Sequence, residues 1–160
     1  MTPTSFEARV HDFLDRKRIA VAGVSRDMKH HPAGNLICRR LKRSGHDVFP
    51  VNPHMQSFEG VRCYPNVQSI PGGVDGVVVL TRPELTERIV RDCRDAGVRR
   101  VWMHQSIGKG SSVSPKAVDY CRRHDISVIA GACPMMYGPH ADLGHACMRW
   151  ILTLTGGLPV

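Results

Sequence analysis

A glycine, a serine and an arginine stand close together where an apolar run of this chain ends. Residues 18–24 are rich in Ala, Val and Ile, as is typical of a buried strand, and the run leads through Gly23 to Ser25 and Arg26. A glycine lets the backbone approach an anion closely, a hydroxyl adds a donor, and a guanidinium forks onto phosphate oxygens. The spacing predicts a seat for a phosphate or pyrophosphate. The alternative is a glycine needed only for a tight turn between strand and helix.

The second apolar strand, residues 47–51, ends in Val51, Asn52 and Pro53, with no acidic residue there. Proteins that bind NAD usually place Asp or Glu at this point to hold the ribose 2′-hydroxyl, and this chain also has one glycine where their fingerprint has three. The pattern argues against ordinary NAD binding. Basic residues near the same place suit a ligand with an additional phosphate, or are simply solvated; they are Lys29, His30, His31, Arg39 and Arg43.

Cys133 follows the last predicted strand and is the one weak candidate for a catalytic residue. A thiol at this position could act as a nucleophile, or it could be a small buried side chain in a turn. No adjacent acid or base is dictated by the sequence. His140, His145 and Cys147 lack a good metal-ligand spacing, so we expect no metal site.

Strand-like and helix-like segments alternate along the chain, which predicts the α/β class. The apolar runs favour a mostly parallel sheet of five or six strands with helices on both faces. Predicted strands are 18–24, 47–51, 61–64, 74–81, 100–103 and 126–130; predicted helices are 4–16, 32–43, 84–96, 114–123 and 139–155. The inward stripes of two of these helices are predicted to include Leu36, Ile37 and Leu41, and Leu85, Ile89, Val90 and Cys93.

In such a sheet the ligand crevice lies outside the carboxyl ends of the strands. The candidate site is therefore formed by residues 23–27, 52–54, 81–83, 104–108 and 131–134.

Composition sets further limits. A length of 160 residues suits one domain over residues 1–160, with the terminal helices packed on it. The six cysteines are scattered singly and are expected to be reduced thiols. No apolar stretch is long enough to span a membrane and no secretory signal is present, so we expect a cytoplasmic protein. The net charge of +8 indicates an anionic partner or a solvated basic surface.

Four segments resemble a known family. They are Ile19-Ala-Val-Ala-Gly-Val-Ser-Arg26, Gly45-His-Asp-Val-Phe-Pro-Val-Asn-Pro53, Val101-Trp-Met-His-Gln105 and Cys133-Pro134. Together they resemble the single-domain CoA-binding proteins, a family similar to the CoA-binding N-terminal domain of the succinyl-CoA synthetase alpha subunit. The resemblance runs from about residue 18 to residue 134.

The resemblance implies a Rossmann-like three-layer sandwich with CoA or an acyl-CoA as ligand. The ADP half of CoA would lie across the carboxyl ends of the strands at 18–24, 47–51 and 74–81. By position, the phosphates would meet Gly23, Val24, Ser25 and Arg26, the nucleotide would border Val51, Asn52 and Pro53, and the other wall would be Thr81, Arg82 and Pro83. Residues 27–31 and 104–110 depart from the family pattern. The resemblance therefore assigns no residues to the pantetheine end of CoA and does not define the exact ligand.

Three hypotheses for the function follow. The first is a CoA or acyl-CoA binding or regulatory module without catalysis of its own. The second is an enzyme that uses Cys133 in acyl or thiol chemistry on a CoA derivative. The third, a nucleic-acid binder, is disfavoured because the basic residues are dispersed and no groove-reading motif is present. The apolar C-terminal helix would suit a homo-oligomer or protein partner as well as the core.

Overall fold

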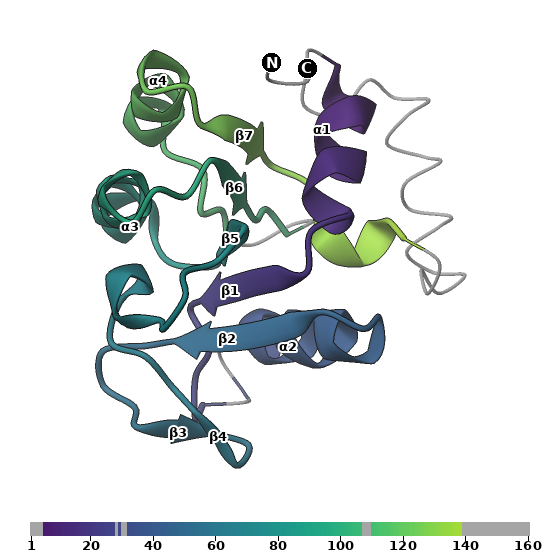
Figure 1. The fold of residues 1–160 in the computed structure, drawn as a ribbon, viewed down its shortest axis with the longest axis vertical. Helices are drawn as coiled ribbons and strands as arrows, with labels where there is room; N and C mark the ends of the chain where they lie inside the picture. Colours follow the sequence, from purple (N-terminus) through teal and green to yellow (C-terminus); the bar gives the residue numbers. More distant parts are fainter. Residues whose placement is uncertain (1–4, 28, 30–31, 107–109, 139–160) are drawn as a thin grey trace.

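The computed structural model describes residues 5–27, 29, 32–106 and 110–138. Its main sheet has five strands, all parallel, in the order β2-β1-β5-β6-β7 (Figure 1). Their bounds are β1 Arg18–Ala22, β2 Asp47–Val51, β5 Gly76–Val79, β6 Arg100–Met103 and β7 Ser127–Ala130. This arrangement confirms the predicted α/β class and the parallel sheet.

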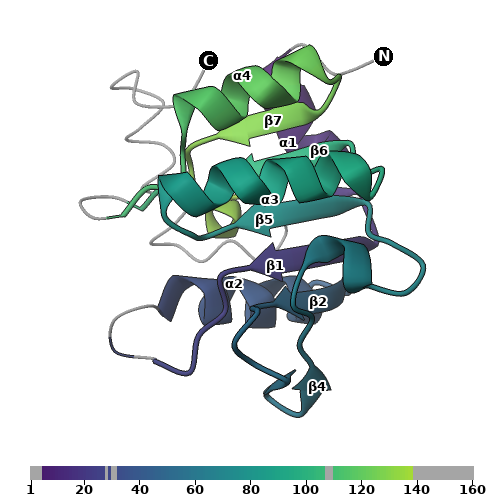
Figure 2. The ribbon, with the colours of Figure 1, turned by 90° about the vertical axis from the view of Figure 1, so that its left-hand side faces the viewer.

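Helices cover both faces of this sheet. Helices α1 (Phe6–Leu14) and α2 (Pro32–Arg43) lie on one face, and α3 (Pro83–Asp95) and α4 (Pro115–Arg123) lie on the other (Figures 1 and 2). Prolines at the first turn of α3 and α4 cost no hydrogen bond, and Ser114 caps α4 by accepting from the amide of Ala117. The result is the three-layer, Rossmann-like sandwich that the sequence predicted.

Shorter elements fill the connections. A hairpin of β3 (Ser57–Phe58) and β4 (Val61–Arg62) follows β2, and the 3₁₀ helices η1 (Val67–Ser69) and η2 (Pro134–Met136) precede β5 and follow β7. The predicted strand at 61–64 is thus half of a separate hairpin rather than a member of the main sheet. A bridge between Val51 and Tyr64 joins that segment to the end of β2.

The strand order brings the site segments together at one edge of the sheet. The chain runs outward from β1 to β2 and then crosses to β5 on the other side, so the order reverses between β1 and β5. The strand arrows point to the same edge of the sheet (Figure 2). A reversal of this kind opens a crevice beyond the carboxyl ends of the two strands, which is where such folds bind ligands.

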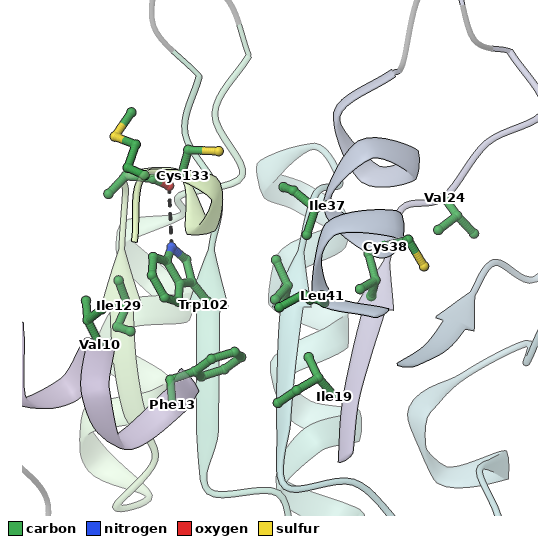
Figure 3. Close-up of a cluster of buried hydrophobic side chains, with 14 of the residues drawn as sticks. Val10, Phe13, Ile19, Val24, Ile37, Cys38, Leu41, Trp102, Ile129 and Cys133 are labelled. Carbon is green, nitrogen blue, oxygen red and sulfur yellow. Dashed lines mark hydrogen bonds between the residues drawn. The ribbon is translucent and has the colours of Figure 1, made fainter. Parts of the chain in front are cut away.

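The core on the α1 and α2 face is built around Trp102. Its ring meets Phe13 of α1 edge to face, with centroids 5.5 Å apart (Figure 3). Its indole N–H donates to the carbonyl of Gly131 at 3.1 Å. Phe13 also lies over Gly76 of β5, where an added Cβ would come within 2.8 Å of the ring. This packing fixes α1 over β5 and β6.

An ion pair fixes the same helix at its end. Asp12 accepts from the guanidinium of Arg100 on β6 at 2.6 Å and from that of Arg16 at 2.6 Å. The hydrogen bond from Arg100 is the main cause that lowers the pKa of the Asp12 carboxyl.

Two of the helix residues predicted to face the core are exposed, so these two predictions were wrong. Leu36 is 42% exposed and Leu85 is 39% exposed, whereas Ile37, Leu41, Val90 and Cys93 are buried as predicted and Ile89 is partly buried. The small or polar residues Gly34, Asn35 and Thr86 take the buried places next to them. The inner faces of the two helices therefore include small and polar residues as well as apolar ones.

Other predictions meet the structure only in part. Cys38, Cys63, Cys93, Cys121 and Cys133 are buried free thiols, as expected, while Cys147 and the predicted helix 139–155 lie outside the described residues. No helix in the described part of the chain is long and apolar enough to cross a membrane.

Candidate binding site at the carboxyl ends of the strands

Two glycines let β1 and α2 approach each other at the turn. Gly23 has a φ of +119°, and an added Cβ would lie 2.8 Å from the carbonyl oxygen of Leu80. Gly34 in α2 faces the same turn, since its added Cβ would lie 2.5 Å from the carbonyl oxygen of Gly23. Sequence reasoning found Gly23 and missed Gly34. The signal was a glycine within the first turn of a predicted helix, where it lowers helix propensity and so calls for a packing reason.

Asn35 fixes the shape of this turn. Its side chain is 1% exposed; its amide nitrogen donates to the carbonyl of Ser25 at 2.7 Å and its oxygen accepts from the amide of Ser25 at 3.0 Å. One side chain thus satisfies both backbone groups of a single turn residue. Asn35 was also absent from the predicted site, because a polar residue outside the predicted apolar stripe of a helix gives no local signal of burial.

Some backbone amides of the turn are hydrogen-bonded within the protein and others are available to a ligand. The amide of Ser25 is used by Asn35, and the amide of Asp27 donates to the hydroxyl of Ser25 at 3.0 Å. Within the described part of the chain, the amides of Val24 and Arg26 donate no hydrogen bond. The Arg26 side chain is exposed, and the side chain of Val24 is buried, so Val24 could contribute only through its backbone.

Asn52 joins the end of β2 to the same turn. Its side-chain amide donates to the carbonyl of Val24 at 2.8 Å, and its side-chain oxygen accepts from the amide of His54 at 2.8 Å. An aspartate in this place could not donate to that carbonyl at neutral pH. The asparagine at the end of β2, where NAD-binding proteins usually have an acid, thus has a structural role: it holds the carbonyl of Val24. Of the neighbouring candidates, Val51 is buried and Pro53 is exposed.

The segment after β5 lies next to the β1 turn and leads into α3. Thr81 is half-buried, with its hydroxyl 3.3 Å from that of Thr86, and Arg82 is exposed at the N-cap of α3. Pro83 is the first residue of that helix. These three residues can border a ligand held at the β1 turn, because the amide of Leu80 still pairs with the carbonyl of Ala22 at 2.8 Å.

The basic residues near the crevice divide into separate groups. Lys29, Arg39 and Arg43 are exposed, and the guanidinium of Arg39 is paired with the carboxylate of Glu59 in the β3–β4 hairpin. His30 and His31 lie outside the described residues. Arg26 is thus the arginine placed in the turn itself.

Cys133 stands at the carboxyl end of β7, just before η2. It is 6% exposed, and burial raises the pKa of its thiol above the usual value; the nearby Arg40 offsets only part of that effect. A buried thiol with a raised pKa carries little thiolate at neutral pH. This environment disfavours the nucleophile hypothesis.

His104 follows β6 and is a buried titratable group in the candidate site at the carboxyl ends of the strands. It is 6% exposed, and burial lowers the pKa of its imidazole to about 4. The ring is therefore neutral at physiological pH.

The lowered pKa of His104 predicts a pH dependence of folding. Because the unfolded chain takes up this proton near pH 6.5 and the folded chain only near pH 4, the stabilising effect is present above pH 6.5 and is lost as the pH falls towards 4. Between pH 7 and pH 4.5 we expect this group to lower the free energy of unfolding by about 2 kcal/mol. Urea titrations at both pH values give the change in the free energy of unfolding for wild type and for His104→Gln. The difference between these two changes is the contribution of His104. Equal pH effects in the two proteins would contradict it.

Comparisons with known proteins show which family this chain is similar to. A family described as CoA binding domain matches residues 17–139. The alpha subunit of an ADP-forming acetate–CoA ligase II from Pyrococcus furiosus is 26% identical over 137 residues, which cover 82% of this chain and 30% of that protein. The chain thus spans less than a third of the length of this relative. An uncharacterized protein of Bacillus subtilis, YneT, is 24% identical over 128 residues, with 79% of this chain and 90% of that protein covered.

A solved structure agrees with these matches. A hypothetical protein from Pyrococcus horikoshii superposes with a TM-score of 0.73 at 26% identity, covering 82% of this chain and 88% of that one. The family match includes β1, the turn, α2 and every strand of the main sheet. This chain therefore belongs to the CoA binding domain family.

Proposed function

We propose that this chain binds CoA or an acyl-CoA and acts as a binding or regulatory module without a catalytic step of its own. The observation that carries the proposal is the turn at residues 23–27, where Asn35 holds the backbone while the amides of Val24 and Arg26 stay available. Such a turn beside a helix N-terminus suits a pyrophosphate. Membership of the CoA binding domain family supports CoA as the source of that group.

The parts of CoA map onto the edge of the sheet in order. The pyrophosphate lies on residues 23–26, close to the start of α2, whose first turn contains no acidic residue. The adenosine lies toward the end of β2, beside Val51, Asn52 and Pro53, and Thr81, Arg82 and Pro83 form the opposite wall. Arg26 adds a charged donor to the phosphates.

Two observations favour a module without catalysis. The thiol of Cys133 is buried and its pKa is raised, which leaves little thiolate for attack on an acyl group. The ADP-forming acetate–CoA ligase subunit from Pyrococcus furiosus is more than three times as long as the matched segment, so the match leaves more than two thirds of that protein uncovered.

Arginine replacement in the turn tests the phosphate seat. Arg26→Gln is expected to weaken CoA binding about tenfold, because a charge-assisted hydrogen bond to phosphate is worth about 1.5 kcal/mol or more. Arg43→Gln is the matched control: it removes the same charge from the far end of α2, and we expect less than a twofold change. Calorimetric titrations of the three proteins with CoA measure both effects.

The same titration with 3′-dephospho-CoA and NADP identifies the ligand class. We expect CoA to bind more tightly than either. Wild-type protein that shows no heat of binding and no thermal stabilisation with CoA would overturn the proposal. Equal losses in Arg26→Gln and Arg43→Gln would instead assign the effect of Arg26 to net charge.

A further inference from the structure

The hydrogen-bond ladder of the main sheet continues one residue beyond the strand ends. In each neighbouring pair, the first residue after one strand donates its amide to the last carbonyl of the next strand, at 2.8 to 3.2 Å. The four donors are Gly23, Leu80, His104 and Gly131, and the acceptors are the carbonyls of Val51, Ala22, Val79 and Met103. These four donors form a row along the rim of the crevice, which we call the rim row.

Two members of the rim row carry side chains, and both belong to the α1 and α2 face. Side chains alternate along a strand, so His104 lies on the same face of β6 as Trp102, which packs on that face under α1 (Figure 3). Leu80 packs against the same cluster. Gly23 and Gly131 at the two ends of the row have no side chain. His104 therefore has a glycine beside it, and the phosphate turn begins on the other side of Leu80.

Among the described residues, the ring of His104 has no hydrogen-bond partner. Although the residue is 6% exposed, no hydrogen bond of its imidazole is found within the described part of the chain. The ring nitrogens are not among the fully buried unpaired atoms of the described residues, so they remain accessible at the rim of the crevice, where a ligand group can pair with them. A neutral imidazole offers one N–H donor and one nitrogen acceptor, which suits an amide.

We propose that His104 positions the pantetheine arm of CoA by hydrogen bonding to one of its amides. The inference rests on the proposed function, which seats the pyrophosphate on the turn that begins at Gly23. His104 lies two strands away from Gly23, a distance of about 10 Å along the rim row. The pantetheine arm leaves the pyrophosphate as a narrow chain with two amides, so it runs over Leu80 and reaches the imidazole before its thiol end.

The arm itself provides the test. Wild type, His104→Leu and His104→Gln are titrated with CoA and with 3′-phospho-ADP, which keeps the adenosine and the pyrophosphate and lacks the arm. We expect His104→Leu to weaken CoA binding about tenfold, the cost of a buried donor or acceptor left unpaired. Binding of 3′-phospho-ADP should stay within twofold, and His104→Gln, which keeps a donor and an acceptor, should bind CoA within about threefold of wild type.

The outcomes separate the two proposals. If His104→Leu binds CoA as tightly as wild type, or loses the same factor for both ligands, the role of His104 is overturned while CoA binding stands. If wild type binds neither ligand, the proposed function and this inference both fall.

A measurement on the unmodified protein covers the case in which a variant fails to fold. The ring ¹⁵N resonances of His104 are expected to shift on addition of CoA and to remain in place with 3′-phospho-ADP. Ring resonances that do not shift on addition of CoA, or that shift equally with both ligands, would overturn the proposed role of His104.

Discussion

Gly23→Ala is expected to destabilise the fold by about 3 to 5 kcal/mol, from backbone strain and from overpacking. The residue sits at a φ of +119°, where a side chain is strained, and its new Cβ would lie 2.8 Å from the carbonyl oxygen of Leu80 and 2.9 Å from the carbonyl carbon. These are backbone atoms at the end of a paired strand, so they cannot swing away as a side chain would. Chemical denaturation measures the loss.

Gly45→Ala is the matched control for that substitution. Gly45 also has a positive φ, +89°, but an added Cβ there meets nothing within 4 Å. Strain alone should cost about 1 to 2 kcal/mol. A Gly23→Ala protein no less stable than Gly45→Ala would contradict the close contact between the β1 turn and β5. The folded fraction of Gly23→Ala should also lose CoA affinity, since the turn must shift, while Gly45→Ala should keep it.

The elements with strong local signals could be predicted from the sequence. Helix α2 has its predicted bounds of 32–43, and β2 and β6 also begin and end where predicted. Proline, glycine and apolar periodicity act within a few residues, so a single sequence contains them. Strands β1 and β5 are shorter than predicted: β1 ends at Ala22, before Gly23 with its φ of +119°, and β5 spans only Gly76–Val79. The apolar runs that predicted them extend into the turns on either side, so strand ends are less well defined by the sequence than strand centres.

What the sequence could not provide was which face of a helix lies nearest the site. Leu36 and Leu85 fit an apolar stripe but are exposed, because the buried places beside them go to Asn35 and Thr86. Asn35 is buried because a backbone turn from elsewhere in the chain needs its two polar atoms. Periodicity arguments assign polar residues to solvent, so they fail where a helix serves a site.

The same reasoning applies to the residues chosen for the site. Gly23, Ser25, Arg26 and Asn52 were predicted from strand ends, and the structure brings them to one turn. Gly34 and Asn35 lie on a helix rather than at a strand end, so a search limited to strand ends passes over them.

Asn35→Ala is the second substitution expected to have a large effect. It leaves the amide and the carbonyl of Ser25 without partners, and we expect a loss of about 2 to 3 kcal/mol in the free energy of unfolding. The loss is smaller than for two fully buried groups, since Ser25 is half-buried and water can reach part of the turn. Alanine is the better helix former and returns a few tenths of a kcal/mol. CoA affinity should fall as well, because the amides of Val24 and Arg26 are no longer held in position.

Asn35→Asp separates the two hydrogen bonds of that side chain. Its carboxylate still accepts from the amide of Ser25, but it repels the carbonyl that Asn35 now donates to at 2.7 Å. A protonated carboxyl can donate, so this variant should approach wild-type stability as the pH falls from 8 to 5, whereas Asn35→Ala should not. Asn66→Ala, which removes an exposed cap from η1, should cost about 1 kcal/mol and leave CoA affinity unchanged. If Asn35→Ala were no more costly than Asn66→Ala, Asn35 would not be what holds the turn.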